Sequence, residues 1–338
     1  MVMESTQSQI VKLLSLTNKI ISSNQITMYL TRQFLALIPY HKFKLESVSV
    51  EVNNICNLKC KLCPVQGLTR QKGSIKFNDF KIIVDKLKKS GVKHIDLMMS
   101  GEMTLNPHLF DMIRYVHKIG LTVFVATNGT SPKTKELIEA EPDGIEFAMD
   151  GISKETEEYY RVNSNFDKVS KHLQELCTYR DKLKKKTKII WQFIVMRHNE
   201  HEVKDAIKLA KKLGVNQISF KPLSLVEGFS EEDKRTLAEK WLPRKWSHSR
   251  YDKKIDVNKP LLCPAIFGPM ILYNGDVALC CYDINGKYVA GNILKEESFE
   301  KIWKSKRFRN LRKNVIKNEL PICKKCSMGL GGSKIYTF

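Results

Sequence analysis

Residues 47–63 read SVSVEVNNICNLKCKLC, a strand pattern that runs directly into three cysteines. Over Ser47–Val52, small or charged side chains alternate with valines, the period-two pattern of a half-buried β-strand. Cys56, Cys60 and Cys63 follow with the spacing CxxxCxxC. In β/α barrels, chemistry lies at the carboxyl ends of the strands. This loop is therefore the first candidate for a functional site.

A regular alternation of short apolar strands and amphipathic helices follows the cysteine loop. We expect helices over 79–89 and 107–118, and further strands over 94–100, 121–127, 145–149, 188–196 and 217–220. Such alternation predicts repeated βαβ units around a parallel sheet, an α/β fold. Six units fit either a partial barrel or a doubly wound sheet.

The chain divides into four segments on this pattern. Residues 1–45 are expected to form a helical extension that packs over the rest of the chain rather than on a membrane surface. The barrel occupies 46–225, and a charged, irregular linker covers 226–258. Residues 259–338 form a small cysteine-rich domain with a hairpin turn at 274–276.

Composition narrows the function class. Of the 338 residues, 42% are hydrophobic, so disorder of the whole chain is excluded. There is no uncharged apolar run long enough to span a membrane and no signal-peptide pattern, so we expect a cytoplasmic protein. The formal charge of +21 favours acidic partners, such as nucleic acid, anionic lipid, phosphorylated substrates or an acidic electron-transfer protein, or reflects solvated helix faces.

Nine cysteines in such a chain point to metal or redox chemistry rather than disulfides. Three thiolates on one loop can hold three irons of a [4Fe–4S] cube and leave the fourth iron open. A structural zinc site needs a fourth ligand nearby, and this loop has none. Cys177 lies in a helical stretch and is expected to be a buried small hydrophobe.

The C-terminal cysteines form a second set. Four thiolates close a [4Fe–4S] cube completely, which leaves one of an adjacent pair spare. A zinc ribbon is the alternative, because it also uses four cysteines with a terminal CxxC. The set comprises Cys263, Cys280, Cys281, Cys323 and Cys326.

The motif CNLKCKLCP after the first strand, with six βα units over Ser47 to Pro222, resembles the radical S-adenosylmethionine (SAM) enzymes. The resemblance implies a partial (β/α)6 TIM-like barrel in which Cys56, Cys60 and Cys63 hold a SAM-binding [4Fe–4S] cluster. It also implies reductive cleavage of SAM to a 5′-deoxyadenosyl radical that abstracts hydrogen from a substrate. The segment from residue 262 resembles the SPASM/twitch extension, and four usable ligands favour the one-cluster twitch form with an auxiliary [4Fe–4S] cluster.

Other positions match the family residue by residue. Ser100, Gly101 and Glu102 stand where the family has a Gly-Gly-Glu-type motif, which implies that Glu102 accepts the amino group of SAM. Two residues depart from that motif, Ser100 for the first glycine and Met103 for the usual proline.

Four more candidates follow from the resemblance. Asn128 and Asp150 are expected to meet the methionine moiety or ribose of SAM, and Leu62 its adenine, while Gln192 is expected to point into the barrel. Turn chemistry remains the alternative for Asn128 and Asp150, and an outward strand position for Gln192.

The resemblance implies an oxidoreductase or radical-based modifying enzyme that takes electrons from a flavodoxin or ferredoxin. We expect a small, anionic sugar- or nucleotide-like substrate, because residues 1–45 look short for a leader-peptide-binding domain. A peptide substrate is the alternative, and RNA a less favoured one. A non-catalytic zinc-binding module is the alternative from a different functional class. Arg161 is expected either to reach an anionic substrate group or to be a helix-face cation.

Overall fold

Six parallel strands form the centre of the molecule. The computed structural model describes residues 25–42, 45–225, 231–246, 263–324, 326 and 333–338. The strands stand side by side in chain order, each hydrogen-bonded to the next. They are β1 (Ser47–Val50), β2 (His94–Leu97), β3 (Thr122–Thr127), β4 (Gly144–Ala148), β5 (Lys188–Val195) and β6 (Gln217–Pro222).

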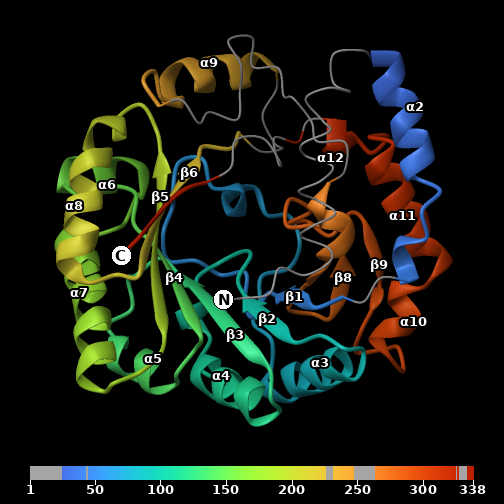
Figure 1. Ribbon diagram of the computed structural model, residues 1–338, viewed down its shortest axis with the longest axis horizontal. Coiled ribbons are helices and arrows are strands. Elements are labelled where there is room, and N and C mark those ends of the chain that lie inside the picture. The colour runs from blue at the N-terminus through green and yellow to red at the C-terminus, as the bar shows by residue number, and fades with distance from the viewer. Residues whose placement is uncertain (1–24, 43–44, 226–230, 247–262, 325, 327–332) are drawn as a thin grey trace.

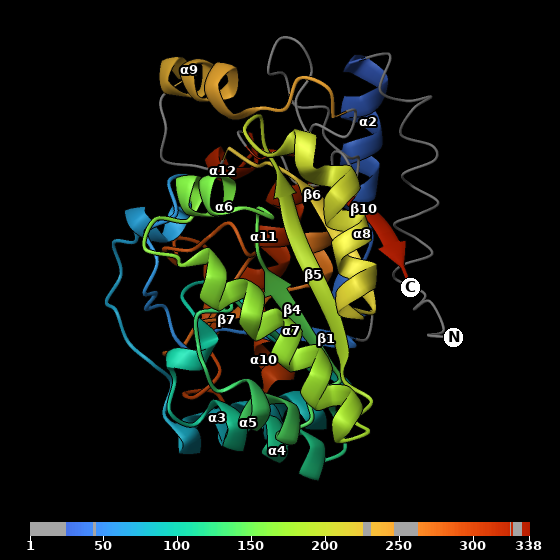
Figure 2. The ribbon, with the colours of Figure 1, turned by 90° about the vertical axis from the view of Figure 1, so that its left-hand side faces the viewer.

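Helices cover the outer side of this sheet, which curves around a central space (Figure 1). Figure 2 shows α7 and α8 lying along the outside of β4 and β5. These helices are α3 (Phe77–Lys89), α4 (Leu109–Lys118), α5 (Thr134–Glu139), α6 (Lys154–Tyr160), α7 (Phe166–Lys182) and α8 (Val203–Leu213). The partial (β/α)6 barrel expected from the sequence is confirmed.

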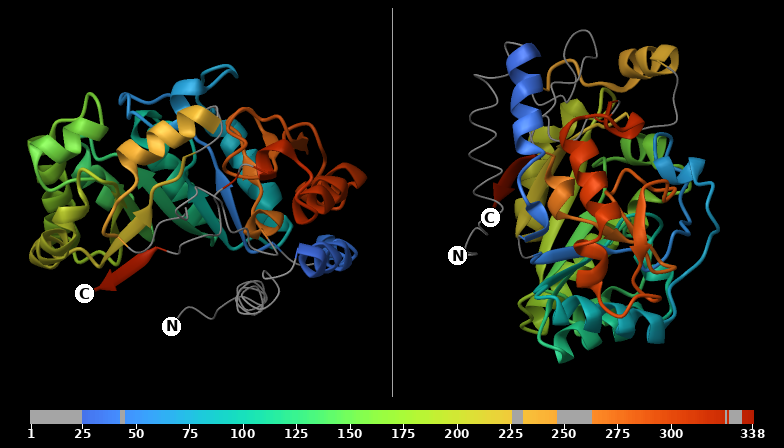
Figure 3. Two further views of the ribbon diagram at one scale, coloured as in Figure 1. Left: turned by 90° about the horizontal axis from the view of Figure 1, so that it is seen from above. Right: turned by 90° about the vertical axis from the view of Figure 1, so that its right-hand side faces the viewer.

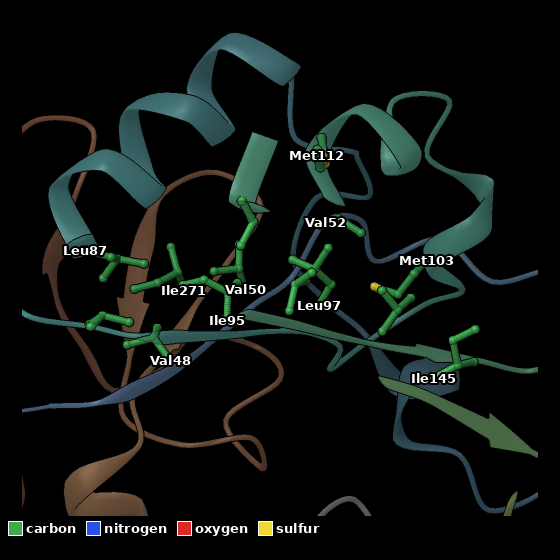
Figure 4. Packing of buried hydrophobic residues seen from close by; sticks show 14 of the residues in the cluster. Val48, Val50, Val52, Leu87, Ile95, Leu97, Met103, Met112, Ile145 and Ile271 are labelled. Atoms are coloured by element: carbon green, nitrogen blue, oxygen red, sulfur yellow. The ribbon is translucent and has the colours of Figure 1, made fainter. Parts of the chain in front are cut away.

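Alternating side chains of the strands build the core on the helix side. Val48, Val50 and Leu97 point toward the helices, where they meet Leu87 of α3 and Met112 of α4 (Figure 4). Each is at most 1% exposed, so the apolar period of the strands is what fixes the helical layer against the sheet.

The other face of the strands lines the inside of the curve and is partly polar. Lys221 of β6 and Glu146 of β4 form an ion pair there with Nζ and Oε1 2.7 Å apart. Ser47 Oγ donates to Asp96 Oδ2 at 3.1 Å, so a second polar contact joins β1 to β2.

The C-terminal segment extends the sheet at both edges. β7 (Met270–Ile271) pairs with β1 in parallel, followed by antiparallel β8 (Asp276–Ala278) and β9 (Val289–Asn292). The hairpin expected at 274–276 joins β7 to β8, and Gly275 turns the chain there with φ +86°. β10 (Lys334–Thr337) returns to pair antiparallel with β6. Three helices lie in this segment: α10 (Phe299–Trp303), α11 (Lys306–Ile316) and α12 (Pro321–Lys324).

Two further α-helices of the described chain lie outside the βα repeat, α2 (Gln25–Leu35) and α9 (Glu231–Trp241). α2 packs on α11, where Arg32 Nη1 donates to Ile316 O at 3.1 Å; the helical pattern expected before residue 25 lies outside the described residues. α9 lies beyond the carboxyl ends of the strands (Figure 2). The segment expected to be an irregular linker therefore contains a helix. The sequence did not predict it, because its many charged residues show no clear apolar period. None of the described helices is long and apolar enough to cross a membrane.

Candidate active site and auxiliary cysteine cavity

The cysteine loop follows β1 at the carboxyl end of the strands and is held in place by its backbone. Lys59 N donates to Val162 O at 2.9 Å, and Lys61 N donates to Tyr160 O at 3.1 Å. Cys60 therefore sits between two hydrogen bonds whose acceptors flank Arg161. Cys56 and Cys63 are half-buried like Cys60, so all three sulfurs lie at the boundary between protein and the open end of the barrel.

Burial controls the chemistry of these thiols. It raises the pKa of Cys60 to about 12, and the neighbouring Arg161 guanidinium acts in the opposite direction. Burial also raises the pKa of Cys56 and of Cys63. Thiols of this kind stay protonated at neutral pH until a metal supplies positive charge. Three such cysteines on one loop fit three irons of a cube.

The segment after β2 is built against the same loop. Gly101 has φ +76°, and a Cβ there would lie 2.5 Å from the carbonyl oxygen of Ile55. Only glycine permits this close approach, which lets Glu102 N donate to Ile55 O at 2.8 Å. Ser100 is fully buried beside it. The Ser100–Glu102 segment thus supports Ile55, the residue that precedes Cys56.

Glu102 is 2% exposed and ties the ends of β2 and β3 together. Its Oε1 accepts from Thr104 Oγ1 at 2.7 Å and Thr127 Oγ1 at 2.6 Å, and its Oε2 accepts from Asn128 N at 2.6 Å. The Asn128 side chain donates to Asn57 Oδ1 at 3.0 Å and lies 3.8 Å from the Cys56 sulfur. The structure therefore brings Glu102 and Asn128 to the cysteine loop.

Asp150 is fully buried in an ionic cluster next to the same loop. Its Oδ2 lies 2.8 Å from both Nε and Nη2 of Arg161, and its Oδ1 accepts from Ile194 N at 2.6 Å. Glu157 Oε2 accepts from Asp150 N at 2.7 Å, and Glu157 Oε1 lies 3.7 Å from Arg161 Nε. We call Asp150, Glu157 and Arg161 the buried ionic cluster.

Sequence reasoning missed Glu157 and left Arg161 undecided. Their i,i+4 spacing was the available signal, since residues so spaced can meet at a helix face; Glu157 lies on α6 and Arg161 directly follows its last residue. The pKa of Glu157 is raised to about 7, chiefly because the residue is buried, with the Asp150 charge adding and the Arg161 charge opposing. Arg161 therefore points inward to carboxylates rather than to solvent from the helix face.

Gln192 and Leu62 lie in different surroundings. Gln192 on β5 pairs with Ala148, so it lies on the same inner face of the sheet as Glu146. This is the inward direction expected from the sequence. Leu62 is buried in an apolar cluster with Tyr160 and Trp241, the last residue of α9.

The five C-terminal cysteines line one cavity of about 290 Å³, together with Met98 and Met99 after β2 and Met270 of β7. Burial raises the pKa of Cys263 to about 11 and also raises that of Cys280. Cys281 is exposed, whereas the other members, Cys263, Cys280, Cys323 and Cys326, are half-buried. Cys177 lies elsewhere, buried in the core as expected.

The cavity suits a group larger than one ion. Across the described ranges, no three His, Cys, Asp or Glu side chains converge closely enough to hold a single metal ion. Five thiols around about 290 Å³ fit a cluster that takes four of them. The guanidinium of Arg32 on α2 lies within electrostatic reach of Cys263 and Cys323, so a cation faces the site from outside the cysteine-rich segment.

Two family models match the chain. Residues 50–240 match the model described as the radical SAM superfamily, and residues 263–327 match the SPASM model, described as an iron–sulfur cluster-binding domain. The first covers the barrel with the cysteine loop, and the second covers the auxiliary cavity.

Relatives of known activity align over one or both parts. A tungsten-containing aldehyde ferredoxin oxidoreductase cofactor-modifying protein of Pyrococcus furiosus is 27% identical over 49% of this chain, and the match spans about half of that protein (48%). The mycofactocin maturase MftC of Mycobacterium ulcerans is 23% identical over 85% of this chain and 83% of its own length.

A solved structure shares the fold. Streptococcus suis SuiB bound to the precursor peptide SuiA superposes with a TM-score of 0.62, 13% identity and coverage of 88% of this chain and 73% of SuiB.

Proposed function

Because the chain belongs to the radical SAM superfamily and carries an iron–sulfur SPASM domain, we propose that it is a radical enzyme that modifies a peptide substrate. Its cofactors are [4Fe–4S] clusters and SAM, which when bound supply a 5′-deoxyadenosyl radical for hydrogen abstraction. The peptide assignment is supported by the fold shared with SuiB, which is bound to a precursor peptide, together with alignment to a maturase along 85% of the chain.

The cysteines divide between two clusters in this proposal. Cys56, Cys60 and Cys63 hold the SAM-binding cluster, with the Arg161 cation beside Cys60 favouring the thiolate. The auxiliary cluster takes Cys263, Cys323, Cys326 and one of the adjacent pair. We assign Cys280 as that ligand, because it is half-buried whereas Cys281 is exposed.

Glu102 and Asn128 position SAM in this proposal. A carboxylate offers about four acceptor positions. Glu102 Oε1 accepts from the Thr104 backbone and from two hydroxyls, whereas among the described residues Oε2 accepts from Asn128 N alone. One acceptor position of Oε2 is therefore left for the amino group of SAM. In this proposal Asp150 acts through Arg161, whose Nε and Nη2 both lie 2.8 Å from its Oδ2.

A small anionic substrate, the first expectation from the sequence, has less support. The inner wall of the barrel carries Lys221, but this lysine is paired with Glu146 at 2.7 Å and is not free to bind an anion. SuiB, which shares the fold, is bound to a precursor peptide. The ion pair weakens the case for an anionic substrate, and the SuiB complex favours the peptide alternative.

The experiment follows hydrogen transfer from substrate to cofactor. The anaerobically reconstituted enzyme is incubated with SAM, a reductant and a lysate of cells grown in deuterated medium, separated into macromolecular and small-molecule fractions. We expect deuterated 5′-deoxyadenosine with the macromolecular fraction, lost after protease digestion but not after ribonuclease. The Cys56→Ala/Cys60→Ala/Cys63→Ala variant is the background control. Deuterium transfer from the small-molecule fraction alone would overturn the peptide assignment.

Iron content tests the cluster assignment separately. The wild-type chain is expected to hold about 8 irons, and either the loop triple variant or a Cys263→Ala/Cys323→Ala/Cys326→Ala variant about 4. Cys177→Ala is the matched control, because Cys177 lies in the core away from both sites. A wild-type content of about 4 irons that drops to none in the loop variant would withdraw the auxiliary cluster.

A further inference from the structure

Helix α2 exposes a stripe of large apolar side chains. Tyr29, Leu30, Phe34 and Leu37 are 62%, 60%, 68% and 76% exposed. Leu30, Phe34 and Leu37 stand at i, i+4 and i+7, so they lie on one side of the helix and its continuation. Leu35 is buried on the side that packs on α11. We call Tyr29, Leu30, Phe34 and Leu37 the α2 stripe; within the described chain it has no apolar cover.

Cations gather beside the end of this stripe. A cavity of about 390 Å³ lies between residues 36–40 and α11, and Lys306, Arg309 and Lys313 line it. These three are exposed and stand at i, i+3 and i+7 of α11. No ion pair links them to a carboxylate of the described residues, and no acidic side chain lines the cavity. The site is therefore uniformly positive.

Arg312 is a fourth cation that lines the cavity. Arg312 is 2% exposed, and its guanidinium stacks on the rings of Trp303 at 3.7 Å and Phe308 at 4.0 Å. Within the described residues its Nη2 has no hydrogen-bond partner. A buried guanidinium without a carboxylate is costly, and an anion in the cavity would offset that cost.

The apolar stripe and the cationic cavity form one continuous surface. Leu37 belongs to both, since it ends the stripe and lines the cavity. Figure 3 shows α2 at the outer margin of the molecule with α11 beside it.

We propose that this α2–α11 face docks on an anionic membrane surface, with the α2 stripe inserted among acyl chains and a lipid headgroup phosphate in the cationic cavity. Apolar side chains on one side of a helix with basic residues alongside are typical of interfacial binding. Each basic residue near an anionic surface adds attraction, and the formal charge of +21 favours approach. The face lies on the SPASM side of the molecule, and the proposal does not depend on the nature of the substrate.

Vesicle flotation with the full-length reconstituted enzyme tests the proposal. We expect binding to vesicles of phosphatidylglycerol and phosphatidylcholine, and none to phosphatidylcholine alone. Two variants separate the two contributions: Leu30→Gln/Phe34→Gln, and Lys306→Gln/Arg309→Gln/Lys313→Gln. Each is expected to weaken binding about tenfold or more.

A matched control removes the same charge elsewhere. Lys204→Gln/Lys211→Gln/Lys212→Gln changes three exposed lysines of α8, which has no exposed apolar stripe, and binding is expected to change by less than about threefold. Unchanged thermal unfolding shows that each variant is folded. The proposal is overturned if the wild-type protein does not bind the anionic vesicles, or if the α8 control loses as much binding as the α11 variant. It is also overturned if Leu30→Gln/Phe34→Gln binds like wild type, the result expected if residues 1–24 or a second copy cover the stripe.

Discussion

Replacement of Arg161 by glutamine is the sharpest test of the buried ionic cluster. Arg161 is the cation that faces two fully buried carboxylates, at 2.8 Å from Asp150 and 3.7 Å from Glu157. Arg161→Gln leaves both carboxylates without their counter-charge. Removing one partner of a buried ion pair costs about 3–5 kcal/mol, because the remaining charge stays desolvated.

The pH dependence of this loss has a defined sign. Glu157 has a native pKa of about 7 against an ordinary value of 4.5, so the native state holds the proton more tightly than the unfolded chain. Its contribution to the free energy of unfolding therefore decreases as the pH rises between these values. Without Arg161 the pKa of Glu157 rises further, so the deficit of the variant should be largest near pH 8 and smaller near pH 5, where the loss at Glu157 is small but the loss at Asp150 remains.

Thermal unfolding of the cluster-free protein, followed by circular dichroism at both pH values, measures this deficit. We expect a fall in Tm of roughly 6 °C or more at pH 8. Lys185→Gln, which breaks the exposed pair with Glu141, is the control and should cost about 0–1 kcal/mol. Adding Glu157→Gln to Arg161→Gln should recover part of the loss. An Arg161→Gln protein as stable as the control at pH 8 would refute the reasoning.

Three further predictions concern other sites. Gly129→Ala should destabilise by about 2 kcal/mol or more in urea unfolding, because φ is +73° and the new Cβ would lie 2.2 Å from the Phe147 ring; wild-type stability would contradict that packing. Iodoacetamide should label exposed Cys281 first in the cluster-free chain and still label it after reconstitution, with Cys280 protected, as peptide mapping can check. Arg32→Gln should make the midpoint potential of the auxiliary cluster more negative in an EPR redox titration, and an unchanged potential would place the cation out of reach.

Most of the fold could be predicted from local sequence patterns. The strands expected over 121–127 and 188–196 lie within one residue of β3 and β5, because their apolar runs are long and flanked by clear breaks. The cysteine loop and the 274–276 turn were equally local, since spacing and turn chemistry are written in consecutive residues.

Contacts between residues far apart in the chain could not be predicted from local patterns. Asp150 looked like a turn residue or a SAM contact, yet its partner Ile194 lies 44 positions further along the chain. The charged stretch around α9 had no apolar periodicity, and the residue that anchors it is Trp241, which packs against Leu62 from the cysteine loop. Such contacts depend on which elements the fold brings together, and one sequence does not state this.

The pairing of β1 with β7 has a consequence for synthesis of the chain. Val50 pairs with Ile271, and Phe220 with Lys334, so both margins of the six-stranded sheet are completed by residues made after the barrel strands. Until then, the growing chain exposes two unpaired strand edges, which are prone to intermolecular pairing. The same late segment carries Cys323 and Cys326. Protection of the sheet edges from aggregation and the arrival of these auxiliary ligands therefore both wait for the segment that follows the barrel.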